Sequence, residues 1–415
     1  MSWWRQNPGR AVRRVLLGLL YTQVATIIGL MTYSGLRKRL RVVTAKGFPI
    51  SPPANLAVGE STATTYTFGQ HLYADMLAEI RGAKHRILFE TYIWKADGVG
   101  KEFKSALVEA AERGVEVYVI YDGFANLVVS PRFFRFPESI HVLRYPVFAT
   151  SWRIFDVRRA GRDHRKILVV DGGVGFVGGY NIGSTYATEW RDTHLRIKGP
   201  SAWDLDNAFV DFWNMRRKKA AHPILRESGS STWEPRIRAL RNVPRQMVFP
   251  IRGMYLEAID RAQDHALITQ AYFIPDQDIR RALMEAAKRG VDVQILMPRE
   301  SNHVIADWLA RGMYEELLNA GVRIFRYTGA MVHAKTATID GKWTTVGTAN
   351  IDRLSLTGNY EINLEVIDDD LAGEMERIFT KDCTHAEELT RSAWAKRSPV
   401  EHFCELILAP LRPLL

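Results

Sequence analysis

Apolar runs alternate with amphipathic stretches along most of this chain, and the alternation occurs twice. Residues 86–94 (RILFETYIW) and 115–123 (VEVYVIYDG) are near-continuous apolar runs of strand length. Between them, residues 100–114 (GKEFKSALVEAAERG) have helical periodicity that ends at a glycine. Strands that alternate with helices predict an α/β sheet with helices on both faces. The same order of elements returns in residues 266–274, 278–290 and 291–298.

The polar residues repeat as faithfully as the apolar ones. Residues 164–181 (HRKILVVDGGVGFVGGYN) recur as residues 333–350 (HAKTATIDGKWTTVGTAN) at a constant offset of 169. Upstream, Tyr92 matches Tyr272 at an offset of 180, so the first copy carries extra residues in its connections. Core packing does not require repeated polar side chains, and we therefore expect a duplication whose chemistry uses both copies.

The repeats and the polar stretch RESGSST at 226–232 suggest where the chain divides. We predict an N-terminal segment at 1–45, a first half at 46–225, a second half at 226–395 and a C-terminal tail at 396–415. The tail has an apolar face after Ser398 and Pro399, and it either lies on a membrane or docks onto the second half.

A stretch of 22 residues without a charge, Val15 to Leu36, lies near the N-terminus. About 20 apolar residues suffice to span a bilayer, so we predict a membrane anchor. Basic residues flank the stretch on both sides and do not orient it. The alternatives are a signal peptide and a buried or interfacial helix, the second of which is favoured by Gln23.

Composition indicates the chemical class of the binding partner but does not identify it. The chain has 415 residues, of which 47% are hydrophobic, enough for two domains that each bury a core. The net charge of +10 indicates an anionic partner, which is nucleic acid, an anionic membrane surface or a phosphate-bearing substrate. Two cysteines imply no disulfide framework. The sequence contains no zinc-ligand spacing, P-loop or Gly-x-Ser-x-Gly motif.

The two copies of the polar segment predict one shared site. Alternation along a strand places a histidine and the lysine two residues later on the same face. The glycines that follow allow a tight turn, and the asparagine after them offers an amide donor to the same place. If the halves pack about a pseudo-twofold axis, both sets meet in one cleft. The expected phosphate-binding and reacting residues are His164, Lys166, Asn181, His333, Lys335 and Asn350.

Such a cleft suits a phosphodiester. One imidazole attacks phosphorus while the other protonates the departing oxygen, giving a double displacement through a phosphohistidine. The lysines and asparagines hold the developing charge, so we expect no metal and no cofactor. An imidazole in this role needs a carboxylate at its other nitrogen. Asp192 and Glu361 qualify, since each lies 28 residues after the histidine of its own half; the alternative is a solvated strand residue repeated by descent.

Asp171 and Asp340 lie seven residues after the histidines. An odd spacing places them on the opposite face of a regular strand, which predicts a structural role in capping the turn. His194, His222 and His303 occur once each and receive no role.

The paired His-x-Lys-x4-Asp segments resemble the motifs of the phospholipase D superfamily, and the resemblance covers roughly residues 60 to 415. Within it, ILFETYIW, WRDTHLRIKGP and the second motif look most like bacterial cardiolipin synthases. This implies two duplicated α/β halves, each a mixed sheet flanked by helices, about a pseudo-twofold axis with one shared active site. It also implies transfer of a phosphatidyl group from one phosphatidylglycerol to another, releasing glycerol.

The resemblance assigns residues as well. His164 is the expected nucleophile and His333 the expected acid, or the reverse, with Asp192 and Glu361 in support. The implied catalytic set is His164, Lys166, Asp171, His333, Lys335 and Asp340, with phosphate bound by Lys166, Asn181, Lys335 and Asn350. The chain departs from many cardiolipin synthases in having one N-terminal hydrophobic segment instead of two.

Residues 133–155 interleave aromatics with arginines. This mixture suits a bilayer interface, single-stranded nucleic acid, or a loop whose aromatics pack on the body. We expect lipid instead of nucleic acid, and a bacterial inner-membrane location with the site on the cytoplasmic side. The alternatives are a hydrolytic phospholipase D, a nuclease of the superfamily and an idle membrane scaffold. The oligomeric state is left open.

Overall fold

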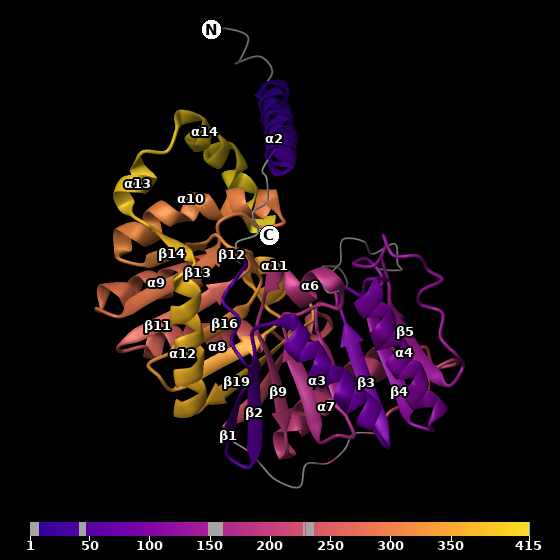
Figure 1. The fold of residues 1–415 in the computed structure, drawn as a ribbon. Helices are drawn as coiled ribbons and strands as arrows, with labels where there is room; N and C mark the ends of the chain where they lie inside the picture. The colour runs from indigo at the N-terminus through magenta and orange to yellow at the C-terminus, as the bar shows by residue number, and fades with distance from the viewer. Residues whose placement is uncertain (1–7, 41–46, 148–160, 227–228, 230–235, 415) are drawn as a thin grey trace.

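The computed structural model describes residues 8–40, 47–147, 161–226, 229 and 236–414. Two α/β halves lie side by side, and a long helix projects from one end of the second half (Figure 1). This helix, α2 (Pro8–Leu40), contains the predicted apolar stretch, and its segment Val12–Leu36 is long and apolar enough to cross a membrane. The predicted fold class, two α/β halves with an N-terminal apolar helix, matches this architecture.

The first half is built on one eight-stranded sheet. Its β3, β4 and β5 are parallel neighbours, and the other pairs are antiparallel, so the sheet is mixed. In spatial order the strands are β1 (Ala54–Val58), β2 (Ser61–Tyr66), β9 (His194–Lys198), β7 (Val174–Gly178), β6 (Ile167–Val170), β3 (Arg86–Thr91), β4 (Glu116–Asp122) and β5 (Ile140–Tyr145).

The second half repeats this plan in another eight-stranded mixed sheet. Its central strands follow the same order as their counterparts in the first half. In spatial order they are β10 (Ile237–Asn242), β19 (Glu361–Ile367), β17 (Trp343–Gly347), β16 (Lys335–Ile339), β11 (His265–Gln270), β13 (Asp292–Pro298), β14 (Arg323–Tyr327) and β20 (Ala386–Leu389).

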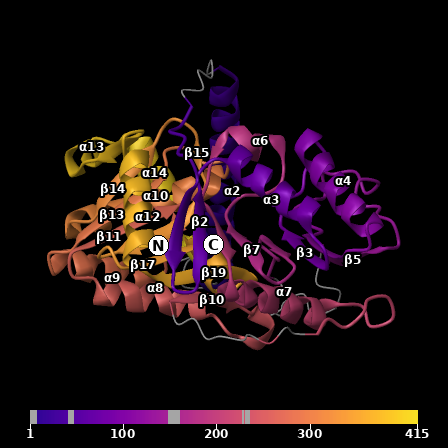
Figure 2. The ribbon, with the colours of Figure 1, turned by 60° about the horizontal axis from the view of Figure 1, so that its bottom comes forward.

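Helices cover the sheets as the alternating pattern predicts. Figure 2 shows α3 and α4 on one side of the first sheet and α7 on the other. The helices are α3 (Gly69–Gly82), α4 (Gly98–Glu112), α6 (Ser184–Thr188), α7 (Trp203–Arg216), α8 (Pro250–Arg261), α9 (Gln277–Lys288), α10 (Val304–Ala320), α11 (Arg353–Thr357), α12 (Asp369–Cys383), α13 (Arg391–Ala395) and α14 (Pro399–Leu408).

The two halves share a buried core. Leu195 and Ile197 of β9 belong to the same apolar cluster as Val346 of β17 and Leu364 of β19. The predicted boundary at 225/226 falls between α7 and β10, and residues 227–228 and 230–235 lie outside the described residues. The four-part division of the chain therefore stays a prediction.

The aromatic stretch that begins at Phe133 packs on the body where it is described. Phe134 stacks on Tyr121 with 4.1 Å between ring centroids, and Phe133 meets Trp94 edge-on at 5.6 Å. These two rings are partly buried, and they therefore follow the alternative of a loop that packs on its own domain. Residues 148–155 of the stretch lie outside the described residues.

Candidate active site

Two equivalent backbone contacts join the halves beside the repeated histidines. Val332 of β15 (Met331–Val332) pairs in parallel with Arg191 of β8 (Trp190–Arg191). The matching bridge links Asp163 to Tyr360. As a result, the amide of His333 donates to the carbonyl of Arg191 at 2.7 Å, and the amide of His164 donates to that of Tyr360 at 3.0 Å.

These contacts bring each histidine to the carboxylate of the other half. Asp192 follows Arg191, and its Oδ2 lies 2.6 Å from Nδ1 of His333. Glu361 follows Tyr360, and its Oε2 lies 2.9 Å from Nδ1 of His164. The sequence spacing counted each carboxylate from the histidine of its own half, whereas in the structure each carboxylate bonds to the histidine of the other half. Two crossed imidazole–carboxylate pairs hold the halves together at the site.

The residue that contacts each carboxylate from the turn after the motif strand differs between the halves. A Cβ placed on Gly179 would lie 2.1 Å from Oδ1 of Asp192, so only glycine leaves room for this carboxylate. At the equivalent position Thr348 donates its hydroxyl to Oε2 of Glu361 at 2.5 Å. The turn glycine of the first motif therefore serves the site by having no side chain.

The histidines and the first lysine lie before the strands that were expected to carry them. β6 begins at Ile167 and β16 begins at Lys335, because the chain ahead of each strand leaves its own sheet to bond with the other half. The argument that His164 and Lys166 share one face of a strand therefore does not apply, because neither residue lies in a regular strand. Their proximity comes instead from Nζ of Lys166, which donates to the carbonyl of His164 at 2.6 Å.

Both lysines are buried next to the histidines. Lys335 donates to the carbonyl of His333, and its Nζ lies 3.0 Å from Nδ1 of the same ring. Burial lowers the pKa of Lys166 to about 7 and that of Lys335 to about 8. Neither lysine lines the neighbouring cavity. Each positive charge therefore acts on the cavity electrostatically, from the far side of the imidazoles.

A cavity of about 480 Å³ opens over the paired histidines. Asn181 and Asn350 lie in its wall as the duplication predicts. Oδ1 of Asn181 accepts from the amide of Ile93 at 3.1 Å, which leaves its amide nitrogen for another partner. Oδ1 of Asn350 is buried and has no hydrogen-bond partner in the described part of the chain. Further lining residues are Tyr92, Tyr186, Trp190, Tyr272, His303 and Asp352.

Asp171 and Asp340 lie away from this cavity. The carboxylate of Asp171 accepts from the backbone amides of residues 84–86, at 2.8 to 2.9 Å, and that of Asp340 accepts from residues 263–265 at 2.9 Å. Both residues have positive φ, 51° and 53°. The implied catalytic set therefore contains two turn-forming residues, in the structural role that strand parity indicated.

The imidazoles are neutral at rest. Burial lowers the pKa of His164 well below its usual range, and the charges of Lys166 and Lys335 act in the same direction. Burial and Lys335 lower the pKa of His333 to about 3. A neutral imidazole whose Nδ1–H donates a hydrogen bond to a carboxylate keeps a lone pair on Nε2. This is the form of histidine that attacks phosphorus.

The pKa values of the two carboxyl groups shift in opposite directions. Burial alone would raise the pKa of Asp192, but the neighbouring His333 and Lys335 outweigh it and the net shift is downward. Burial raises the pKa of Glu361 to about 8, against the charge of Lys166 and hydrogen bonds from Thr348 and Asn359. Among the described residues, no group of three or more His, Cys, Asp or Glu side chains is placed to hold a metal ion.

The sequence matches a known family in both halves. The family model described as "Cardiolipin synthase, PLD-like domain" matches residues 76–213 and again residues 255–383, more than half of the chain. The chain belongs to this family. The predicted resemblance to the phospholipase D superfamily, with its duplicated α/β fold, is thereby confirmed.

Curated relatives of this cardiolipin synthase family member extend over most of its length. The cardiolipin synthase of Staphylococcus aureus strain N315 is 33% identical over 363 residues, 84% of this chain and 73% of the relative. Cardiolipin synthase 2 of Staphylococcus epidermidis strain ATCC 12228 is 31% identical, over 86% and 75%. The crystal structure of phosphatidylserine synthase from Haemophilus influenzae Rd KW20 shares the fold, with a TM-score of 0.66 and 16% identity over 88% and 94%.

Several residues of this family member's site escaped the sequence analysis. Tyr92 packs on His164 at 4.6 Å between ring centroids, and Tyr272 packs near His333 at 6.3 Å; their repeat at an offset of 180 was a usable signal. His303, beside Tyr272 at 5.2 Å, occurs once and gave no signal. Asp352 matches Gly183 in the first half, so the repeat hides it. Burial raises the pKa of Asp352 to about 7.

Proposed function

We propose that this enzyme transfers a phosphatidyl group between two phosphatidylglycerol molecules, yielding cardiolipin and glycerol. The observation that carries the proposal is the pair of largely buried imidazoles, each bonded to a carboxylate of the other half, at one cavity. The staphylococcal relatives named as cardiolipin synthases support the choice of substrate.

In the first step, Nε2 of His164 attacks the phosphorus of phosphatidylglycerol. His333 takes up a proton at Nε2 from solvent as the anionic phosphate enters. The P–N bond forms as the bond to the glycerol oxygen breaks, and His333 gives this proton to that oxygen. Asp192 stabilises the imidazolium that carries this proton, and the anionic phosphate entering the site favours the same charged form. Glycerol then leaves and a phosphohistidine remains.

In the second step, the terminal hydroxyl of another phosphatidylglycerol gives its proton to Nε2 of His333. Its oxygen attacks phosphorus, the P–N bond breaks and cardiolipin is released. Lys166, Lys335 and the amides of Asn181 and Asn350 stabilise the charge on the phosphoryl oxygens in both steps. One phosphodiester replaces another, so the exchange is close to neutral in free energy and needs no nucleotide.

We assign the nucleophile to His164 by the resemblance of its motif. The side chain of His164 is 12% exposed and that of His333 is 6% exposed, so phosphorus entering from the cavity reaches His164 with less displacement. We further propose that α2 anchors the chain in the bacterial inner membrane. The catalytic halves are expected on the cytoplasmic side.

The test is lipid mass spectrometry after the purified chain is incubated with phosphatidylglycerol vesicles, with His164→Ala as the control. Cardiolipin and free glycerol that are absent with the variant are the expected result. Phosphatidic acid in place of cardiolipin would make the chain a hydrolase whose phosphohistidine is opened by water. Unchanged lipid would overturn both and direct attention to other phosphodiesters, beginning with single-stranded DNA.

A further inference from the structure

The length of α2 sets how deeply the rest of the molecule must sit if this helix anchors the chain. Its 22 charge-free residues, Val15 to Leu36, are about 33 Å long at a rise of about 1.5 Å per residue. The hydrocarbon core of a bilayer is about 30 Å thick, so nearly all of this stretch is needed to cross it. Yet Ile27 and Leu30 pack against the core of the second half. The part of the protein beside them therefore lies at membrane depth.

That part is α14. Gln23, near the middle of the charge-free stretch, is 7% exposed, and its Nε2 donates to the carbonyl of Ile407 at 3.1 Å. A polar side chain inside a bilayer needs such a partner, and here the last turn of α14 supplies it. Figure 1 shows the two helices next to each other at the end of the second half.

Apart from His402, the exposed side chains of α14 are apolar. Val400, Phe403 and Leu406 are 69%, 51% and 71% exposed. Its acidic side chains are instead bound to arginines: Glu401 accepts from Arg311 at 2.5 Å, and Glu405 accepts from Arg311 and from Arg397, at 3.1 Å each. An exposed apolar face with neutralised charges is costly in water and suits acyl chains.

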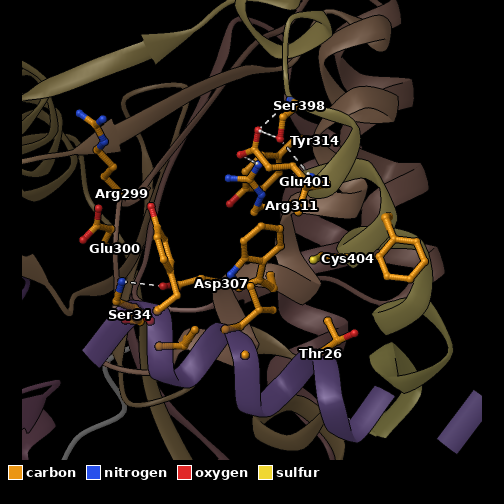
Figure 3. A pocket seen from close by; sticks show the side chains of 18 of the residues that line it. Thr26, Ser34, Arg299, Glu300, Asp307, Arg311, Tyr314, Ser398, Glu401 and Cys404 are labelled. Carbon is orange, nitrogen blue, oxygen red and sulfur yellow. Dashed lines mark hydrogen bonds and ion pairs between the residues drawn. The ribbon is translucent and has the colours of Figure 1, made fainter. Parts of the chain in front are cut away.

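A cavity of about 790 Å³ lies between α2, α14 and α10, and its walls differ in polarity (Figure 3). Thr26 of α2 and Cys404 of α14 lie on one side of it, and Arg299 and Glu300 lie across from them. The charged wall comes mainly from α10 and the loop before it. The walls from α2 and α14 mix apolar side chains, among them Leu30, Val400 and Phe403, with polar ones and Glu401. Charges are therefore concentrated on the side of the catalytic body, as at a leaflet edge.

The same loop and first turn of α10 separate this cavity from the active site. Ser301 and Val304 face the cavity at α2, whereas Asn302, His303 and Ile305 line the cavity over the catalytic histidines. A membrane at α14 would therefore border the first cavity, which only this loop and the first turn of α10 separate from the substrate cavity.

We propose that α14 is a second membrane-inserted element, whose face of Val400, Phe403 and Leu406 contacts the acyl chains of the leaflet nearer the catalytic halves. The proposal rests on the anchor assigned to α2. The two helices would then enter that leaflet together, joined by Gln23.

The test measures, on the full chain, whether single labelled residues lie within the acyl-chain region of a bilayer. Cys383 and Cys404 are replaced by alanine, and one new cysteine carrying the environment-sensitive dye NBD is placed at residue 403, at residue 20 or at residue 367. Ile367 is a matched control: it is 51% exposed like Phe403 and ends β19, a strand that begins at the active-site residue Glu361. The labelled proteins are bound to vesicles of phosphatidylglycerol and phosphatidylcholine that carry brominated acyl chains.

The expected result is quenching at residues 20 and 403 and none at 367. Quenching at 20 without quenching at 403 would overturn the proposal and leave the anchor intact. No quenching at either site would overturn both.

A second measurement covers the case in which a labelled protein misfolds. Phe403→Asp should lower turnover of phosphatidylglycerol in vesicles about tenfold, because a charge in the acyl region opposes insertion. It should leave turnover of a monomeric short-chain phosphatidylglycerol unchanged, as should Ile367→Asp with both substrates. Equal vesicle turnover by the two aspartate variants would contradict the proposal.

Discussion

Oδ2 of Asp192 lies 2.6 Å from Nδ1 of His333, a histidine of the half to which Asp192 does not belong. The reciprocal pair, Glu361 with His164, crosses in the other direction. Each half therefore supplies a histidine that the other half orients. This reciprocity gives a physical reason for both copies to be intact, because losing either carboxylate impairs the opposite motif.

The crossed pairing predicts different defects for the two carboxylates. Asp192→Asn should weaken the acid, His333, and Glu361→Gln should weaken the nucleophile, His164, each by on the order of 10²- to 10⁴-fold in kcat with phosphatidylglycerol. A phosphatidyl ester of p-nitrophenol separates the two, since its leaving group needs no proton. Formation of the intermediate from this ester should be nearly normal in Asp192→Asn and slow in Glu361→Gln, measured as the p-nitrophenol burst. The opposite pattern would mean that the two histidines exchange roles.

The close approach of Asp192 to Gly179 predicts that even a methyl group at residue 179 will lower activity. Gly179→Ala places a methyl where Oδ1 of Asp192 lies, and the carboxylate must move away from His333. We expect kcat to fall at least as far as in Asp192→Asn while the protein stays folded. Gly253→Ala, in α8 with nothing within 4 Å of the added methyl, is the matched control and should raise stability by about 0.5–1 kcal/mol. Full activity in Gly179→Ala would show that the close approach does not hold in solution.

The duplicated fold and most of the site were predictable because the chain repeats polar residues at a fixed spacing. His164, His333, Asn181 and Asn350 meet at one cavity as the offset of 169 indicated. The structural role predicted for Asp171 agrees with its contacts to the amides of residues 84–86, although the parity count began at His164, which lies before β6.

The crossed pairing was not predictable from spacing. An offset of 169 relates Asp192 to Glu361 and His164 to His333, and it is satisfied equally whether partners lie in one half or in two. The choice is made by the bridge between Val332 and Arg191 and its counterpart, which are contacts between segments far apart in the sequence. His303 and Asp352 were missed for a related reason, because each lacks a repeated counterpart.

The assignment of the nucleophile predicts where the intermediate accumulates. In His333→Ala, p-nitrophenol should be released in a burst of one equivalent from the activated ester, because attack by His164 needs no acid there, and turnover should then stop. Mass spectrometry under alkaline conditions, where phosphohistidine survives, should locate the phosphatidyl group on His164. His164→Ala should show neither burst nor adduct. An adduct on His333 in His164→Ala would reverse the assignment.

Replacing Asp171 by asparagine should lower the stability of the protein without lowering its catalytic activity. In Asp171→Asn the asparagine tolerates the left-handed backbone at φ 51° but presents one acceptor oxygen to the three amides of residues 84–86. We expect the free energy of unfolding to fall by about 1–2 kcal/mol, with kcat per folded molecule within about twofold of the parent. Hydrogen bonds from these amides outweigh burial and hold the pKa of Asp171 below its usual value, so the stabilisation is present above the unfolded-state pKa of about 3.9 and is lost as the pH falls through the folded-state pKa. The difference in unfolding free energy between parent and variant, measured by urea titration, should therefore be complete at pH 7 and shrink below about pH 4. A variant that keeps its stability but loses activity as His164→Ala does would instead place Asp171 among the catalytic residues.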